Sequence, residues 1–176
     1  HGDNDCITVN QIYTYNKKRK KLNCINSFNT NASYQNEIVA ADKNYVTIHN
    51  SDQPAEVGWI SWNIPYKYSK GKLVAATTST TTVKSLIANN KKDKYSKYFA
   101  KNQFVTAKKL TFYNGSKVAY TVPKGKVVTL TKLSLSKDVI YLQFKYGKKT
   151  GWAHVNGTKY NFSKPWFQGV NARLAG

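Results

Sequence analysis

Apolar and polar residues alternate along much of this chain in short runs, with Gly, Pro, Asn and Lys between the runs. Alternation with a period of two is the pattern of half-buried β-strands, and the intervening residue types are typical of turns. We therefore predict an all-β fold. The predicted strands cover residues 7–15, 22–25, 37–41, 45–48, 57–64, 110–113, 118–122, 127–130 and 139–144. Residues 83–90 have apolar positions at helical spacing and predict one short helix.

Two Gly-Trp dipeptides, Gly58-Trp59 and Gly151-Trp152, each follow a turn and stand near the end of an alternating run. The text upstream of the two dipeptides is similar, which indicates an internal duplication into two small units. A Thr-rich segment separates the two halves and is the best candidate for a junction. We predict a first module at 1–70, a junction that contains the helix at 71–99, and a second module at 100–176.

The same alternation predicts which side chains of the two Gly-Trp strands face the core, because successive side chains of a strand point to opposite faces. We expect Ile60, Trp62, Ile64, Ala153 and Val155 to face inward, and Trp59, Ser61, Trp152 and His154 to face outward. An outward Trp is either a platform for a ligand or a side chain that packs under a neighbouring loop. Both interpretations stay open for Trp59 and Trp152.

The charge is strongly basic, with 28 Lys and Arg against 8 Asp and Glu and a net charge of +20. Only Arg19 and Arg173 are arginines. Lys acts as a mobile point charge, whereas Arg reads bases and fixed carboxylates with a planar fork, so a lysine field favours a flexible polyanion as partner. The candidate ligand-binding clusters are Lys17, Lys18, Arg19, Lys20 and Lys21; Lys124 and Lys126; and Lys145, Lys148 and Lys149. A solvated hairpin tip remains the alternative for residues 17–21.

Enzyme, metal and cofactor chemistry find little support in the sequence. The eight acidic residues form no spaced pair on strong elements, and His49 and His154 lie on predicted strands without a nucleophile beside them. No phosphate-binding loop or metal-ligand spacing occurs, so we expect neither a metal nor a cofactor and no enzymatic activity. No apolar stretch is long enough to cross a bilayer. The chain lacks Met and starts at His1, which leads us to expect a processed piece of a longer protein.

The run Ile12-Tyr13-Thr14-Tyr15-Asn16-Lys17 has a counterpart in Leu110-Thr111-Phe112-Tyr113-Asn114-Gly115, which Pro123-Lys124-Gly125-Lys126-Val127-Val128-Thr129 and the Gly-Trp strands follow. These sequence segments resemble the bacterial SH3-like modules of the Gly-Trp type. They are most similar to the Lys- and Tyr-rich cell-wall-binding repeats of lactobacillus surface-layer and surface-associated proteins. The first half departs from the pattern, because it lacks the Pro-Lys-Gly turn and carries two cysteines.

The resemblance implies two tandem SH3-like barrels that bind teichoic or lipoteichoic acid and anchor a secreted protein on the surface of a Gram-positive bacterium. An assembly or catalytic domain is then expected outside this piece. The composition leads to the same expectation, since many Lys–phosphate contacts release counterions and two modules add avidity. Three other interpretations stay open. They are a nucleic-acid-binding basic barrel, a host-directed adhesin for sulfated glycans such as glycosaminoglycans, and the targeting region of a wall-lytic enzyme or bacteriocin.

Cys6 and Cys24 are either two separate thiols or one disulfide, which is expected to add roughly 3 kcal/mol to the free energy of unfolding. A secreted wall protein predicts the disulfide, because such bonds persist in oxidising compartments. Mass spectrometry of the intact chain is then expected to show the gain of two hydrogen atoms after reduction. An unchanged mass would contradict the disulfide.

Overall fold

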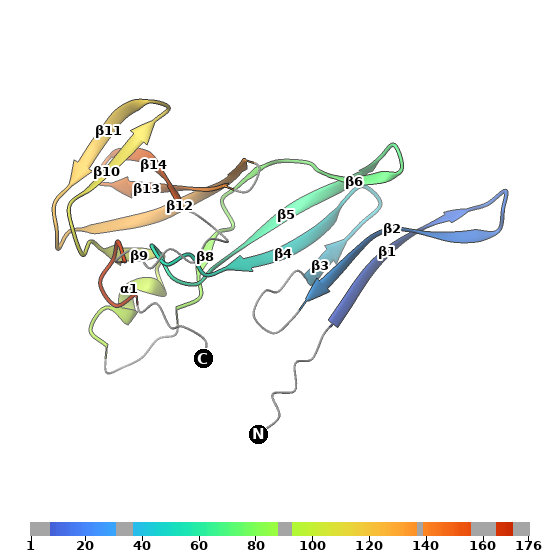
Figure 1. Cartoon of the computed structure of the whole chain (residues 1–176), viewed down its shortest axis with the longest axis horizontal. Coiled ribbons are helices and arrows are strands. Elements are labelled where there is room, and N and C mark those ends of the chain that lie inside the picture. The colour runs from blue at the N-terminus through green and yellow to red at the C-terminus, as the bar shows by residue number, and fades with distance from the viewer. Residues whose placement is uncertain (1–7, 31–36, 88–92, 137–138, 156–164, 171–176) are drawn as a thin grey trace, which may run out of the picture. The chain divides into compact units, whose positions relative to one another are not determined.

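The computed structural model confirms the all-β prediction (Figure 1). It describes residues 8–30, 37–87, 93–136, 139–155 and 165–170. The strands are β1 (Thr8–Asn16), β2 (Lys21–Thr30), β3 (Glu37–Ala41), β4 (Val46–Asp52), β5 (Ile60–Ser69), β6 (Lys72–Ala75), β7 (Ser79–Thr80), β8 (Lys84–Ser85), β9 (Gln103–Val105), β10 (Leu110–Asn114), β11 (Lys117–Val122), β12 (Val127–Ser136), β13 (Val139–Tyr146) and β14 (Lys149–Val155). The helix α1 covers Ser96–Phe99.

The chain divides into two compact units, and their boundaries differ from the expected modules. Unit 1 consists of residues 1–51 and 63–78, and unit 2 of residues 52–62 and 79–176. Both Gly-Trp dipeptides therefore belong to unit 2, where one per repeat was expected. The Thr-rich segment is no plain linker, since it supplies β7, which pairs with β12 of unit 2.

Unit 1 contains a two-stranded hairpin and the greater part of a second sheet. The hairpin pairs β1 with β2, and its register shifts between Ile12 and Tyr13. The second sheet has the order β3-β4-β5-β6, with β5 belonging to this unit from Asn63 onward. Among the described residues of unit 1, Ile48 and Ile64 are buried apolar side chains, each 1% exposed.

Unit 2 is built on an antiparallel sheet in the order β11-β10-β14-β13-β12-β7. The long strand β12 pairs with β9 through its first residues and with β13 from Thr129 onward. Its register with β13 shifts between Leu130 and Lys132, and such an irregularity lets a strand bend. Thr106, directly after β9, also forms an antiparallel bridge with Phe167. The bridge thereby joins the C-terminal segment 165–170 to the residue that follows β9.

Phenylalanine rings fill the core of unit 2. The ring centroid of Phe104 lies 5.4 Å from that of Phe99, 5.9 Å from that of Phe144 and 4.9 Å from that of Phe167. None of these four side chains is more than 1% exposed. Edge-on and tilted ring pairs of this kind add about 0.5–1.5 kcal/mol each beyond the area they bury. Phe112 extends the cluster, with its ring 5.4 Å from that of Phe144.

Gly151 lets the β10–β11 hairpin pack tightly on β14. A Cβ atom at this position would lie 2.9 Å from Cβ of Phe112, 3.0 Å from Cε1 of Tyr120 and 3.1 Å from Cβ of Ala119. Gly58 is also crowded, since a Cβ atom there would lie 2.8 Å from Cδ1 of Ile87, and its φ of +74° lies in the left-handed region that favours glycine. The two Gly-Trp dipeptides thus share a close approach, but only Gly58 also needs a left-handed backbone.

Most inward and outward assignments are confirmed. The inward side chains Ile60, Trp62, Ile64 and Val155 are 6% exposed or less, and the outward Trp59 and His154 are exposed. Ala153 is only half-buried. The prediction for Ser61 was wrong: its side chain is 3% exposed, because the first residues of β5 are covered on both faces.

The predicted helix at 83–90 is also wrong for the residues described there. Lys84–Ser85 form β8, which pairs with Ile60 and Ser61 of β5. Sheet pairing outweighs a helical spacing that covers only two turns, since so short a helix has little stability of its own. The helix lies later, at Ser96–Phe99, and within the described residues no helix is long and apolar enough to span a membrane.

Replacement of Gly151 by Ala is expected to lower the free energy of unfolding by about 1–3 kcal/mol, because the added methyl group overfills a packed site. Urea denaturation monitored by fluorescence measures this change. Thr150→Ala is the matched control at the neighbouring exposed position of β14 and is expected to stay within about 0.5 kcal/mol of the parent protein. Equal stabilities of the two variants would contradict the role given to Gly151.

Candidate functional site

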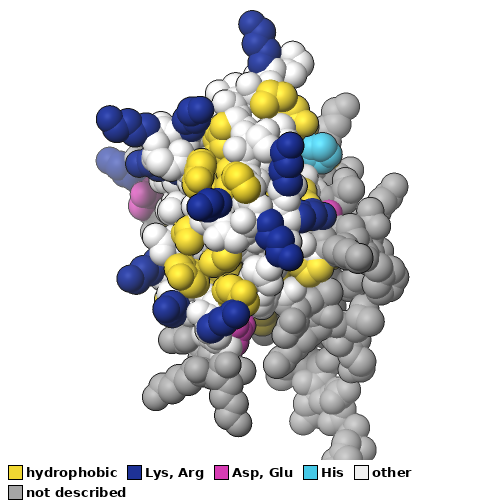
Figure 2. Space-filling view, turned by 90° about the vertical axis from the view of Figure 1, so that its left-hand side faces the viewer, with side chains coloured by type: hydrophobic (Ala, Val, Ile, Leu, Met, Phe, Trp, Pro, Cys, Tyr) yellow, Lys and Arg dark blue, Asp and Glu magenta, His cyan; other side chains and the backbone are white. Residues whose placement is uncertain are grey.

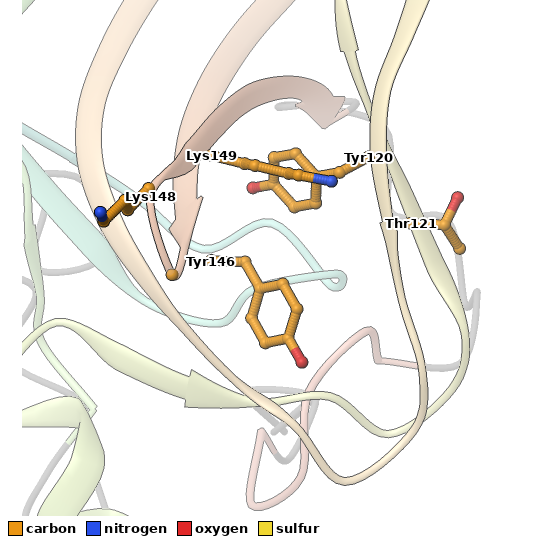
Figure 3. A pocket seen from close by; sticks show the side chains of 6 residues that line it. Tyr120, Thr121, Tyr146, Lys148 and Lys149 are labelled. Atoms are coloured by element: carbon orange, nitrogen blue, oxygen red, sulfur yellow. The ribbon is translucent and has the colours of Figure 1, made fainter.

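A surface pocket of about 560 Å³ lies in unit 2 between β11 and the turn that joins β13 to β14 (Figure 3). Its lining residues are Tyr120, Thr121, Tyr146, Gly147, Lys148 and Lys149. Gly147 has a φ of +58°, as tight hairpin turns require. The turn therefore places two consecutive lysines beside two tyrosines that come from different strands.

Two residues that line this pocket, Tyr120 and Tyr146, belong to a stack of three aromatic rings. The ring of Tyr120 lies between those of Tyr146 and Phe112, with centroid distances of 6.3 Å and 5.0 Å and interplanar angles of 24° and 26°. The Tyr120 hydroxyl donates a hydrogen bond of 2.6 Å to the carbonyl oxygen of Phe144. Burial raises the pKa of Tyr120 to about 12, so this hydroxyl is a donor throughout the physiological range. This part of the pocket lining is thus rigid and uncharged.

Two lysines of the β13–β14 hairpin, Lys148 and Lys149, line the pocket, whereas Lys145 has the opposite parity on β13 and lies on its other face. Lys145, Lys148 and Lys149 are all exposed, and Lys149 is the cross-strand partner of Tyr146. In Figure 3 the Lys149 side chain extends toward the side of Tyr120, whereas that of Lys148 extends away from the two tyrosines. The structure therefore brings two of the three predicted lysines to the pocket and adds Tyr120 and Tyr146, which the sequence analysis did not single out.

Lys124 and Lys126 lie in a second fixed turn of unit 2, between β11 and β12, and both are exposed. The side chain of Thr106 fixes this turn by hydrogen bonds to its backbone. Its hydroxyl donates to the carbonyl oxygen of Pro123 at 2.7 Å and accepts from the backbone N–H of Lys126 at 3.0 Å. Because Thr106 is fully buried, the turn is part of the rigid body of the unit.

The basic run 17–21 lies in unit 1, at the turn between β1 and β2. All five side chains are exposed. The Asn16 side-chain oxygen accepts a hydrogen bond of 3.1 Å from the backbone N–H of Arg19, which fixes the turn. The predicted hairpin is confirmed, and its role in binding stays a prediction.

The structure places the two predicted tryptophan platforms differently. Trp59 is 38% exposed, and its carbonyl oxygen accepts a hydrogen bond of 2.8 Å from the backbone N–H of Leu86. Trp152 is only partly exposed and lies in the middle of the sheet, opposite Tyr113 of β10 and Gln143 of β13.

The surface around these lysines carries little negative charge. After Asp93 the sequence has one acidic residue, Asp138, which lies outside the described residues. Every basic side chain in the described part of unit 2 is a lysine. Figure 2 shows Lys and Arg side chains spread over one face of the molecule, with hydrophobic side chains exposed between them. Such a surface attracts anions and lacks the forks that read fixed, planar partners.

The carboxyls and histidines form no recognisable reaction centre in the described part of the chain. His49 is half-buried, and its Nδ1–H donates to Oδ1 of Asn63 at 2.7 Å, whereas His154 is exposed beside Tyr141. Burial raises the pKa of the Asp52 carboxyl, and the charge of the buried Glu56 adds to this rise. No group of three or more His, Cys, Asp or Glu side chains among the described residues has the arrangement to hold a metal ion.

The cysteine prediction is not tested. Cys24 lies in β2 opposite Tyr13 and is exposed. Cys6 lies outside the described residues, so the disulfide stays a prediction.

No family model, curated protein or solved structure matches this chain. The site must therefore be interpreted from its own residues.

The buried hydroxyl of Tyr120 predicts a pH-dependent stability. Between pH 10, where a solvent-exposed Tyr ionises, and about 12, the unfolded chain loses this proton while the folded chain keeps it. The unfolded state then binds fewer protons, so the free energy of unfolding falls as the pH rises through this interval.

Tyr120→Phe is expected to show a smaller fall over the same interval. At neutral pH it is expected to be less stable by about 1–3 kcal/mol, because the Phe144 carbonyl loses its buried donor. Urea denaturation at neutral pH and across this alkaline range measures both effects. Identical pH profiles for the two proteins would show that Tyr120 is not the group responsible.

Proposed function

We propose that this chain is a non-covalent anchor that binds an anionic, phosphate-bearing polymer of the cell envelope, such as teichoic or lipoteichoic acid. It would hold a secreted surface protein on the wall of a Gram-positive bacterium and perform no catalysis. The observation that carries this proposal is the pocket at the β13–β14 turn, where Lys148 and Lys149 stand beside the stacked tyrosines.

The charge of the site favours a phosphate-bearing partner. Exposed lysines attract phosphates without strict geometry, and each contact releases counterions, which makes binding sensitive to salt. The absence of arginine from the described part of unit 2 argues against readout of nucleic-acid bases, for which the planar guanidinium is the preferred group.

The shape of the site favours a flexible polymer over a rigid partner. A pocket of about 560 Å³ lies within the range of small-molecule sites, and the partly exposed Tyr146 in its lining suits contact with one or two polyol or sugar units. The lysine turns at 17–21 and 124–126 offer further contacts to a long chain. Many weak contacts along one polymer add avidity without a single tight site.

The connectivity of unit 2 supports an SH3-like barrel as part of the same proposal. Strand β12 pairs with β9 at its start and with β13 further on, with a register shift between Leu130 and Lys132. A strand that two sheet segments share in this way forms the corner of a small barrel. For unit 1 the barrel rests on the sequence resemblance alone.

Co-sedimentation with purified cell walls tests the function. The protein is expected to pellet with intact walls, to pellet less as the salt concentration rises, and to stay in solution with walls from which teichoic acid has been extracted. Equal pelleting with extracted walls would mean that the protein binds peptidoglycan and not teichoic acid. No pelleting with any wall would contradict the proposed function.

A pair of charge-matched variants tests the site. Lys148→Gln/Lys149→Gln is expected to weaken binding to poly(glycerol phosphate) roughly 5- to 30-fold, since exposed ion pairs contribute up to about 1 kcal/mol each. Lys70→Gln/Lys72→Gln removes the same charge from exposed positions at the β5–β6 turn of unit 1 and is the control. Equal losses in both double variants would mean that net charge binds the polymer and that the pocket does not.

A further inference from the structure

A band of aromatic and aliphatic side chains, of which Trp152 is partly exposed and the others are exposed, crosses the outer face of the unit 2 sheet outside the pocket. Tyr113 of β10 is the cross-strand partner of both Val118 of β11 and Trp152 of β14. Trp152 is in turn the partner of Gln143 of β13. Side chains of directly opposed residues lie on the same face of a sheet, about 4.5–5.5 Å apart at their Cβ atoms. We call Val118, Tyr113, Trp152 and Tyr141 the outer band.

Tyr141 extends the band on β13. It precedes Gln143 by two positions and therefore shares its face, diagonal to Trp152. Its ring lies 6.1 Å from that of His154, its partner on β14. Across β11, β10, β14 and β13 the band covers three interstrand spacings, or about 14 Å. This length accommodates more than one ring of a ligand.

The exposure of the band is unusual for side chains of this size. Val118 is 60% exposed, Tyr113 42% and Tyr141 36%, and Trp152 is partly exposed. The Tyr and Trp rings therefore present part of their apolar surface to solvent. Rings of this kind bind partners that have an apolar face and a polar edge.

The flanks of the band carry positive charge. Lys132 is the partner of Gln143 on β12, and Lys145 follows Gln143 by two positions on the same face of β13. No carboxylate occurs among the described residues of β10 to β14. The ligand that complements this surface is therefore an anionic chain that also carries rings.

We infer that the outer band binds the sugar rings of the polymer, so that the ligand is a sugar-bearing polyanion and not a bare polyol phosphate chain. This inference rests on the proposed function for the polyanion itself and adds a second contact surface with its own chemistry. Sugar rings would stack on Tyr113, Trp152 and Tyr141, while neighbouring phosphates contact Lys132 and Lys145. The pocket and the band lie on opposite faces of β13, because Tyr146 has the parity of the core residues and Gln143 the opposite one.

A comparison of two matched polymers tests the inference. Poly(glycerol phosphate) is prepared bare and with N-acetylglucosamine or glucose attached, and the binding of each is measured by calorimetry. The unmodified protein is expected to bind at least one sugar-bearing polymer roughly 10-fold more tightly than the bare one, which corresponds to about 1.4 kcal/mol and lies within the range of one or two ring stacks. Trp152→Ala and Tyr113→Ala are each expected to abolish this preference and to leave the affinity for the bare polymer unchanged. Trp152→Phe is expected to retain it.

Trp59→Ala is the matched control, because it removes another exposed indole of unit 2 that is not part of the band. It is expected to keep the preference. Equal binding of bare and sugar-bearing polymers by the unmodified protein would overturn the inference and leave the proposed function standing, whereas binding of neither polymer would overturn both. The inference would also be overturned if the unmodified protein bound poly(U) more tightly than the sugar-bearing polymers and Trp152→Ala lost this binding. The rings would then stack on nucleobases. Self-association of the protein that Trp152→Ala abolishes, without a preference for sugar, would contradict it as well.

Discussion

The close approach of three chain segments at Gly151 is the constraint on which the binding face of unit 2 depends. Phe112 and Tyr120 of the β10–β11 hairpin reach the backbone of β14 only because this position has no side chain. The contact lets Tyr120 donate to the carbonyl of Phe144 and stack on Tyr146. It also places Tyr113 opposite Trp152 on the other face of the sheet. The absence of a Cβ atom at Gly151 thus allows the close strand packing that positions the residues of both the pocket and the outer band.

The alternating pattern was sufficient to predict the all-β class and most strand positions, because period-two burial is a local property of each strand. The strands predicted at 110–113 and 118–122 pair as β10 and β11, and the turn between them contains Gly115 with a φ of +61°. The division of the chain was not accessible in this way. The boundary between the two units falls inside strand β5. Short strands such as β7 and β8 form only because a partner strand pairs with them. Long-range pairing of this kind leaves little trace in the local sequence.

The site was predicted in part. The lysines of the β13–β14 turn stood out in the sequence because three of them lie within five residues. Tyr120 and Tyr146 did not, although both lie on alternating strands as inward-facing aromatics, since nothing local shows that their rings stack from separate strands. The outer band was missed for the same reason. Its members come from four strands, and only the cross-strand register brings Val118, Tyr113 and Trp152 into one row.

Nuclear magnetic resonance of the isotope-labelled protein during titration with a sugar-bearing poly(glycerol phosphate) tests the central claim most directly, because it reports on every backbone amide at once. The account predicts that the largest shift changes fall on residues 145–149 and around Tyr113 and Trp152, and that added salt reverses the former more than the latter. Shift changes spread evenly over all exposed lysines, with none at these positions, would contradict it.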